Sequence, residues 1–363
     1  MKLSRSPYII EVDNATQTGS KIELFLANTP GFLANPQYTL SKLIPASNNT
    51  KTFYNISPYV REYYTFNVWQ SATGLTYGID TSTNYLVNYK VKSYNLIGGT
   101  YVLDTTETGT FVDGYNYYMD GYNATTPIAL LDEGTYFYNY DATILTTQGN
   151  GLWGSFDCEL SIGDVVKYTD LVTGATFTDT ATTDGVKSYA RVYLTYAPNG
   201  NKVEILIGGV TERWTAYFKP QCEPKYQPVV VDFINRYGSW SRIFFQKVKK
   251  RSINVKTNEY KFNPSELPYY PNLSGDGQFK EFNINAKETI KLNTGWVNDD
   301  YGDYLQQMLL SEKVLLLDYE VNTNYTPVKA KTKSLQKQVG INDGMINYEL
   351  DFEFAYDLIN NVV

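Results

Sequence analysis

The stretch that most constrains the fold is "GWVNDDYGDYLQQMLLSEKVLLLDYE", which begins at Gly295 and holds the chain's one long helical pattern. At 100° per residue, Tyr301, Leu305 and Met308 fall on one face together with neighbouring apolar residues. The residues that follow lose this period and are typical of a strand that is apolar on both faces. We therefore predict one helix over 296–311, covered by a sheet, in a chain otherwise built from strands.

Composition and local patterns favour a mainly β fold. The chain has 363 residues, including 34 tyrosines and 17 phenylalanines, which are residues that strands prefer. Alternating runs such as "KIELFLA" (21–27), "YTLSKLI" (38–44) and "YYTFNVW" (63–69) are separated by Gly, Pro and Asn, and one helical turn is expected at "NISPYVREYY". The predicted fold class is mainly β, with tandem antiparallel β-sandwich modules followed by a β module braced by one α-helix.

Two similar segments predict two hairpins. "NLIGGTYVLDT" (95–105) aligns without gaps with "DLVTGATFTDT" (170–180). In each, a glycine (Gly99 or Gly174) is expected to supply the positive φ of a tight turn. Duplicated sandwich modules and ordinary hairpin chemistry both explain this agreement, and the sequence does not decide between them.

The chain divides into three predicted modules. Residues 1–126 form a β-sandwich, 127–218 a second β-sandwich that is acidic and tyrosine-rich, and 219–363 the helix-braced module. One interpretation of the second module is an insertion. The boundary near 217–228 rests on three prolines in "YFKPQCEPKYQP", which are expected to break any regular element.

The net charge of −7 hides a strong asymmetry. The segment 93–185 has thirteen acidic residues and one basic residue, whereas 236–261 has eight basic residues and one acidic residue. Such a shift marks separate modules, and the acidic half would repel phosphate, so we predict no nucleic-acid partner. A solvated strand end is the simplest interpretation of the basic run 247–251, and contact with an acidic neighbouring subunit is the alternative.

Several classes of site are disfavoured by the residues that the chain lacks. It has no histidine, which removes Ser-His-Asp catalysis and the commonest zinc ligand. Cys158 and Cys222 are interpreted as two small buried hydrophobes, with a disulfide as the alternative, and no cofactor is predicted. No run of 18 apolar residues is present, so no membrane insertion is expected. The first residues contain too short an apolar run for a signal peptide, which predicts synthesis in a cytoplasm.

The last two predicted strands can be paired from their charges. "VKAKTK" (328–333) alternates with lysine and "NYELDFEF" (347–354) alternates with acidic residues. One antiparallel register places Val328 against Phe354 and Ala330 against Phe352, so a single pairing satisfies core and charge. The charged pairs of this register are Lys333 with Glu349, Lys331 with Asp351, and Lys329 with Glu353.

A tyrosine-rich stretch, "VDGYNYYMDGYN" (112–123), allows two interpretations. Asp-Gly and Tyr-Asn are ordinary turn residues. Tyrosine rings beside carboxylates are also what a sugar site uses, because rings stack on C–H faces and carboxylates bind hydroxyls. The candidate glycan-contacting residues are Tyr115, Tyr117, Tyr118, Tyr122, Asp113 and Asp120.

The chain resembles tail and baseplate structural proteins of tailed bacteriophages infecting Bacteroidota, in particular distal-tail or tail-tube-like hub proteins. The resemblance lies in "SPYIIEV…KIELFLA…YTLSKLI…FYNISPYVREY", "PVVVDFINRYGSWSRIFFQK" and "NTGWVNDDYGDYLQQMLLSEKVLLL…YELDFEFAYD". It implies a virion structural protein of the tail, with a tail-tube-like final module. Its implied partners are copies of itself in a ring, other tail or baseplate proteins, and fibres.

Two other functions remain open from the sequence. A glycan-binding protein for host attachment would use the tyrosine-rich stretch and cell-surface glycan as its partner. A glycosidase needs only two carboxylates, and the chain has 38 acidic residues. Because no phosphate loop, metal cluster or nucleophile motif is present, the prediction is a structural protein and not an enzyme.

Overall fold

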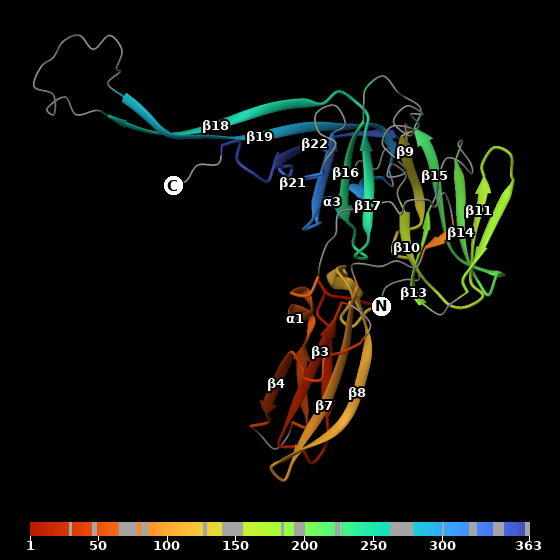
Figure 1. Cartoon of the computed structure of the whole chain (residues 1–363), viewed down its shortest axis with the longest axis vertical. Coiled ribbons are helices and arrows are strands. Elements are labelled where there is room, and N and C mark those ends of the chain that lie inside the picture. The colour runs from red at the N-terminus through yellow and green to blue at the C-terminus, as the bar shows by residue number, and fades with distance from the viewer. Residues whose placement is uncertain are drawn as a thin grey trace, which may run out of the picture. The chain divides into compact units, whose positions relative to one another are not determined.

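A computed structural model of the chain (Figure 1) consists mainly of β-strands. Strands account for 60% and helices for 7% of the residues, which confirms the predicted mainly β class with several sheets and one short helix near the C-terminus. The structure describes residues 1–28, 31–45, 49–64, 78–80, 86–125, 129–139, 155–182, 185–191, 200–221, 226, 228–261, 279–299, 301–318, 325–336 and 345–359.

The chain forms two compact units, each assembled from separate segments. Unit 1 comprises Met1–Pro224, Asp232–Phe244 and Leu310–Lys313, and unit 2 comprises the rest. Both predicted sandwich modules therefore lie in unit 1. The first segment of unit 1 ends within residues 217–228, and the division into three modules stays a prediction.

Unit 1 begins with a two-layer sandwich. One layer has the strand order β1-β8-β7-β3-β4 and the other pairs β2 with β5, with helix α1 after β5. Two layers allow each sheet to bury its apolar face against the other. The bounds are β1 (Lys2–Leu3), β2 (Ile9–Asp13), β3 (Gly19–Ala27), β4 (Tyr38–Leu43), β5 (Lys51–Asn55), α1 (Ser57–Arg61), β7 (Val87–Ile97) and β8 (Thr100–Val112).

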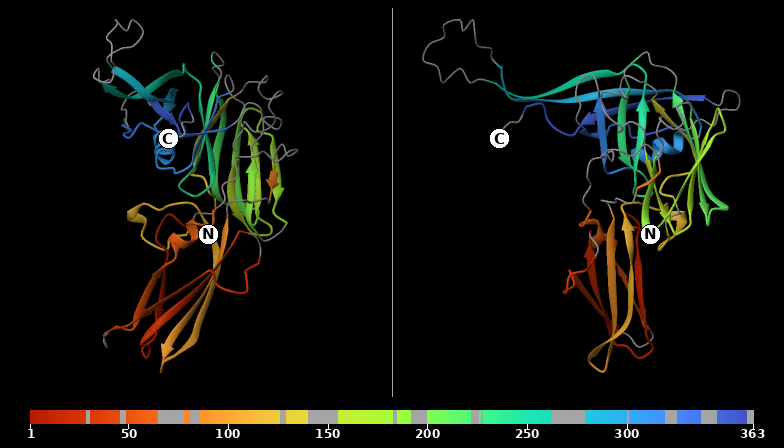
Figure 2. Two further views of the ribbon diagram at one scale, coloured as in Figure 1. Left: turned by 60° about the vertical axis from the view of Figure 1, so that its left-hand side comes forward. Right: turned by 45° about the vertical axis from the view of Figure 1, so that its right-hand side comes forward.

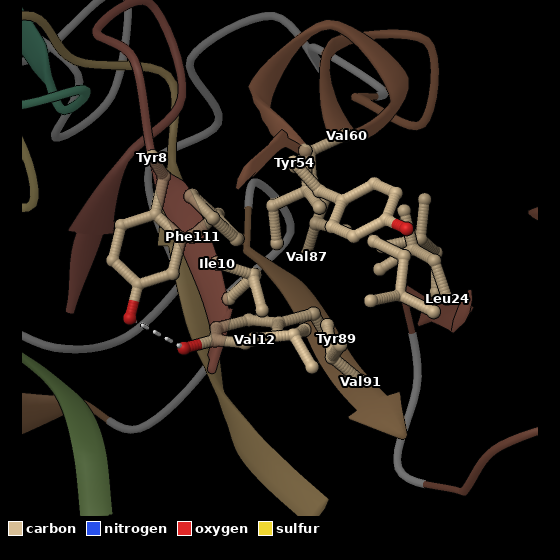
Figure 3. Close-up of a cluster of buried hydrophobic side chains, with 13 residues drawn as sticks. Tyr8, Ile10, Val12, Leu24, Tyr54, Val60, Val87, Tyr89, Val91 and Phe111 are labelled. Carbon is tan, nitrogen blue, oxygen red and sulfur yellow. Dashed lines mark hydrogen bonds between the residues drawn. The ribbon is translucent and has the colours of Figure 1, made fainter. Parts of the chain in front are cut away.

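The core of this sandwich follows the predicted alternation. Ile22, Leu24 and Leu26, which the pattern placed on one side of β3, are all buried. Figure 3 shows Tyr8 and Tyr89 pointing their hydroxyl groups toward one another among aliphatic side chains of both layers. Both hydroxyls donate to the Glu107 carboxylate at 2.5 Å, so the polar ends of these rings are satisfied.

The second part of unit 1 contains two further sheets, ordered β10-β13-β6 and β12-β11-β14-β15-β9. The pairing of β6 with β13 joins residues on opposite sides of position 126. A 3-10 turn, η1 (Tyr118–Asp120), lies between β8 and β9 in the chain. The bounds are β6 (Gly78–Asp80), β9 (Gly134–Asn139), β10 (Ser155–Leu160), β11 (Val165–Asp170), β12 (Thr176–Thr180), β13 (Gly185–Arg191), β14 (Asn201–Ile207) and β15 (Thr211–Gln221).

The expectation that prolines end every regular element over 217–228 is wrong. Strand β15 continues through Pro220 and pairs there with β9. Its pairing with β14 ends at Phe218, so a proline at position 220 removes no hydrogen bond to that strand.

The two predicted hairpins are present, but their turns differ. The β7–β8 turn has two residues, Gly98 and Gly99, both with positive φ, whereas the longer β11–β12 turn uses Gly174 at φ 71°. Cys158 is fully buried, as its interpretation as a small hydrophobe predicts. Cys222 and most of the predicted strand 63–69 lie outside the described residues.

Strands β16 (Val229–Ile234) and β17 (Trp240–Phe245) are neighbours in their sheet. All twelve residues are buried, and each strand is divided between the two units. The turn that joins them is closed by Asn235, whose side-chain oxygen accepts from the backbone N–H groups of Tyr237 and Ser239.

Unit 2 is built on strands that neighbour one another in the order β20-β21-β22-β19-β18. Helix α3 contacts β19. In Figures 1 and 2, β18 and β19 extend past the other strands of this unit as a two-stranded ribbon. The bounds are β18 (Lys250–Lys261), β19 (Phe279–Asn298), α3 (Tyr301–Leu309), β20 (Val314–Asp318), β21 (Thr326–Ala330) and β22 (Met345–Phe354).

The observed helix is shorter than the predicted 296–311. Residues Trp296 to Asn298 belong to β19 and pair with β22, so the helix begins only at Tyr301. The packing prediction is confirmed, because Tyr301, Leu305 and Met308 are all buried. Helix α3 therefore covers strands with its apolar face.

Candidate assembly interface

Strand β19 has two halves with different surroundings. From Thr289 to Asn298 it pairs with β22 on one side, and from Phe279 to Glu288 its one partner among the described strands is β18. We call β18 together with Phe279–Glu288 the arm. Isolated two-stranded ribbons are marginally stable in water, so a ribbon of this length needs support from its root or from a partner.

The arm exposes apolar side chains along its length. All twelve residues of β18 are exposed, and Ile253 and Val255 each show 61% of their surface. These two residues are two positions apart in the strand and thus share a face. Three further exposed apolar residues of the arm are Phe279, Phe282 and Ile284. Exposed apolar side chains that share a face, as Ile253 and Val255 do, are typical of interaction sites.

A bulge bends the arm near its middle. The register with β18 shifts at Asn283, which has φ 51°, a conformation that asparagine tolerates better than most residues. Beyond the bulge, the rings of Tyr260 and Phe282 meet edge to face at 5.6 Å. Glu259 and Glu281 lie directly opposite one another, an arrangement that disfavours the isolated ribbon.

The root of the arm is fixed by a buried carboxylate. Asp318 on β20 is 2% exposed. Its carboxylate accepts hydrogen bonds from Lys249 at 2.7 Å and from Arg251 at 2.8 Å. Arg251 also binds Glu288 on β19 at 2.8 Å. Two residues of the predicted basic run 247–251 thus form intramolecular ion pairs, which corrects its interpretation as a solvated strand end.

The segment after β22 supports the arm from one side. Leu358 donates its backbone N–H to the Ala286 carbonyl at 2.8 Å. The Asn285 side chain donates to the Ile359 carbonyl and accepts from the Ile359 N–H, as a neighbouring strand would. This support reaches β19 at residues 285–286, and the described residues of the arm beyond the bulge pair only with each other.

The arm carries six basic and three acidic side chains, so its net charge is positive in a chain of net charge −7. β18 is the last strand in its sheet and, among the described residues, has β19 as its one neighbour. An open, basic and partly apolar strand edge is a template for pairing with an acidic surface.

The predicted lysine–carboxylate register is confirmed over three pairs. Val328 pairs with Phe354, Lys329 with Glu353, and Ala330 with Phe352. Strand β21 ends at Ala330, so the predicted pair of Lys333 with Glu349 is not formed within a ladder.

The lysines that neutralise these carboxylates lie on β19. Lys291 binds Glu349 at 2.5 Å and Lys287 binds Glu353 at 3.3 Å. The hydrogen bond from Lys291 also lowers the pKa of Glu349. Lys331 instead donates its backbone N–H to the Asp351 carbonyl at 2.8 Å. The sequence pattern predicted correctly that β21 pairs with β22. The carboxylates of β22, however, form their ion pairs with lysines of β19, the strand on the other side of β22.

The six candidate glycan-contacting residues do not form one surface. Tyr118 and Tyr122 are exposed, whereas Tyr115 and Asp113 are buried. Asp120 accepts from the Tyr117 backbone N–H at 2.9 Å and thereby closes the 3-10 turn.

The rings of Tyr115 and Tyr117 already have cationic partners. The Arg5 guanidinium lies over the Tyr115 ring at 4.9 Å, and that of Arg236 lies over Tyr117 at 4.7 Å. A sugar therefore cannot stack on these covered faces. The burial of Tyr115 and Asp113 and the turn closed by Asp120 fit the interpretation of this stretch as turn residues, and glycan contact at the exposed Tyr118 and Tyr122 stays a prediction.

The burial of Asp113 predicts a pH-dependent stability. Burial raises the pKa of this carboxyl from 3.8 to about 6, against the opposing influence of Arg5 and Arg61 and with a contribution from Glu312. Because the folded state holds the proton more tightly, the stabilisation is complete below the unfolded pKa and is lost as the pH rises through about 6. The shift corresponds to about 3 kcal/mol.

We expect the unfolding free energy of the native chain to fall relative to that of Asp113→Asn between pH 4 and pH 7. Asparagine keeps the contact with Ser4, whose hydroxyl lies 3.4 Å from the Asp113 carboxylate. Urea titrations of both proteins across this range measure the difference. A difference in unfolding free energy that stays constant across this pH range would contradict the raised pKa of Asp113.

Other classes of site receive no support from the described residues. They contain no group of three or more His, Cys, Asp or Glu side chains placed to hold a metal ion. Within the same part of the chain, neither α-helix has the length and apolarity needed to span a bilayer. No protein-family model matches the sequence, and a comparison with curated proteins gives no match.

Proposed function

We propose that the protein is a structural subunit of a phage tail or baseplate, and that it assembles with copies of itself into a ring or hub. The observation that carries the proposal is the arm, an exposed ribbon whose outer part, among the residues that the structure describes, pairs only within itself. A second copy that covers the apolar face of Ile253 and Val255 would remove this surface from water. Full burial of such side chains is worth about 1.5–3 kcal/mol each.

Charge supports a second copy as the occupant. The arm is basic, and the acidic segment 93–185 belongs to the other unit of the chain. Acidic side chains of that unit include Asp104, which is exposed on β8 away from the two residues that pair with β1, and Asp179, which is half-buried on the edge strand β12. A contact between different surfaces of two copies is heterologous, and such contacts close into rings when the rotation allows.

The proposed role needs no reaction, cofactor or nucleic acid. The virion location, the tail and baseplate partners, and synthesis in the host cytoplasm come with the resemblance to tail proteins and belong to the same proposal. The sandwich modules would then be available to hold fibres or neighbouring tail proteins.

The proposal predicts a defined oligomer. Purified chain should elute at a multiple of 41.3 kDa in light scattering and show rings in negative-stain micrographs. Because surface electrostatics guide the contact, the oligomer should weaken when salt rises from about 50 mM to 500 mM, as screening shortens the reach of charges. A monomer at high concentration, with no ring in virion micrographs, would overturn the proposal.

A further inference from the structure

We propose that unit 1 contains a binding pocket for a neutral, polyhydroxylated sugar, at a place distinct from the tyrosine-rich stretch. The pocket has a volume of about 660 Å³, within the range of about 300–1,000 Å³ that is usual for ligand sites. It is lined by Leu131, Asp132, Glu133, Ile207, Arg213, Trp214 and Tyr237. This inference is independent of the proposed assembly role.

The floor of the pocket is held rigidly by hydrogen bonds from two sides. The Trp214 indole N–H donates to the Leu131 carbonyl at 2.9 Å. The Asn235 side chain donates to the Leu130 carbonyl at 2.8 Å. Tyr136 donates its hydroxyl to the Asp132 carbonyl at 2.6 Å. Because successive residues are fixed in this way, the pocket exists before any ligand arrives, which lowers the cost of binding.

A β-bulge explains how two consecutive residues line the same pocket. Ile205 pairs with Trp214 and Leu206 pairs with Glu212, so Arg213 has no partner on β14. In a regular strand Arg213 and Trp214 would point to opposite faces. The bulge changes the direction of one of these two side chains, so that both line the pocket. Such bulges are frequent beside functional sites.

The polar groups of the rim come from separate elements. The Tyr237 hydroxyl, on the β16–β17 turn, donates to the Asp132 carboxylate and fixes its orientation. Burial and this hydrogen bond raise the pKa of Tyr237, so it stays a neutral donor. Glu133 and Arg213 are exposed. Two acceptor groups and one donor group thus surround an apolar and aromatic floor.

The charges select the class of ligand. The two carboxylates disfavour an anion, and the Arg213 guanidinium disfavours a cation. An apolar ligand would displace water from three charged groups. It would offer no hydrogen bonds in place of those that the groups made to water, which is costly. A neutral sugar offers hydroxyl donors to Asp132 and Glu133, acceptor oxygens to Arg213, and C–H surface to the floor. This combination matches every group on the rim.

The test is a glycan array of neutral oligosaccharides built from hexoses, 6-deoxyhexoses and N-acetylhexosamines, probed with the full chain. Calorimetry on each positive sugar then compares the native chain with Glu133→Gln and Arg213→Ala. We expect each substitution to weaken binding at least tenfold without changing the melting temperature, because both side chains are exposed. Glu212→Gln is the matched control, since Glu212 precedes Arg213 on β15 but does not line the pocket.

Three results would overturn the inference. The first is an array without any neutral sugar bound. The second is a sugar whose affinity is unchanged in both pocket variants or is lowered equally by Glu212→Gln. The third is tighter binding of N-acetyl-lysine methylamide than of any sugar, which would make the pocket a site for a basic side chain.

Discussion

Replacing Ile253 and Val255 together by aspartate should weaken self-association of the chain at least 100-fold while leaving it folded. Both side chains are 61% exposed in the single chain, so the substitution removes no core contact. In the proposed oligomer the same positions are covered, and each buried carboxylate would lose hydration without gaining a partner. A 100-fold change corresponds to about 2.7 kcal/mol, which two lost apolar contacts readily supply. Sedimentation velocity over a concentration series measures the change.

The control for this experiment is the pair Asn254→Asp and Asn258→Asp. It adds the same two negative charges to β18 but leaves Ile253 and Val255 in place. Both asparagines are exposed, and strand alternation puts them on the opposite face of the arm. We expect this control to retain most of the self-association. Equal losses in both variants would show that charge, and not the apolar face, governs the contact, and the proposed interface would be wrong.

Local periodicity predicted those parts of the fold that depend on neighbouring residues. The alternation of β3 and the apolar face of α3 could be read from side-chain order alone. The β21–β22 register was also predictable, because one pairing satisfied both the charges and the core. Each of these features depends on contacts close in the sequence, or on two strands with complementary patterns.

Long-range pairing was not predictable in this way. Strand β6 pairs with β13 about a hundred residues away, and β1 runs parallel to the end of β8. Neither pairing leaves a local signal, since a strand's pattern shows which face is buried but not which strand lies beside it. The helix start was also missed, because Val297 fits an apolar helix face and an apolar strand face equally well.

The arm left a signal that the sequence interpretation passed over. Ile284, Ala286, Ile290 and Leu292 recur at every second position apart from Glu288, and the complementary strand shows Ile253 and Val255. The pocket left none. It depends on the bulge at Arg213 and on the approach of Tyr237 to Asp132, which lie 105 positions apart. One of the two sequence interpretations of residues 112–123 was a sugar site on its tyrosines, of which the structure buries Tyr115.

Replacing Arg242 by methionine should destabilise the chain by about 3–5 kcal/mol. Arg242 and Asp232 form a two-fold hydrogen-bonded ion pair, with both distances 2.7 Å, between strands whose residues are all buried. Their side chains are 1% and 0% exposed. Removing one partner leaves an uncompensated charge away from water, and Asp232→Leu should have a similar effect for the same reason. Guanidinium titrations and the melting temperature measure both losses.

The double variant Asp232→Leu with Arg242→Met separates the strength of the ion pair from the cost of leaving one charge alone. Because an apolar pair of similar volume needs no desolvation of charge, we expect it to recover most of the stability, to within about 1 kcal/mol of the native chain. Lys51→Ala is the matched surface control: Lys51 pairs with Glu11 where both are about half exposed, so its loss should change the stability far less than the loss of Arg242. A double variant as unstable as the single variants would mean that the ion pair itself specifies the packing of β16 on β17.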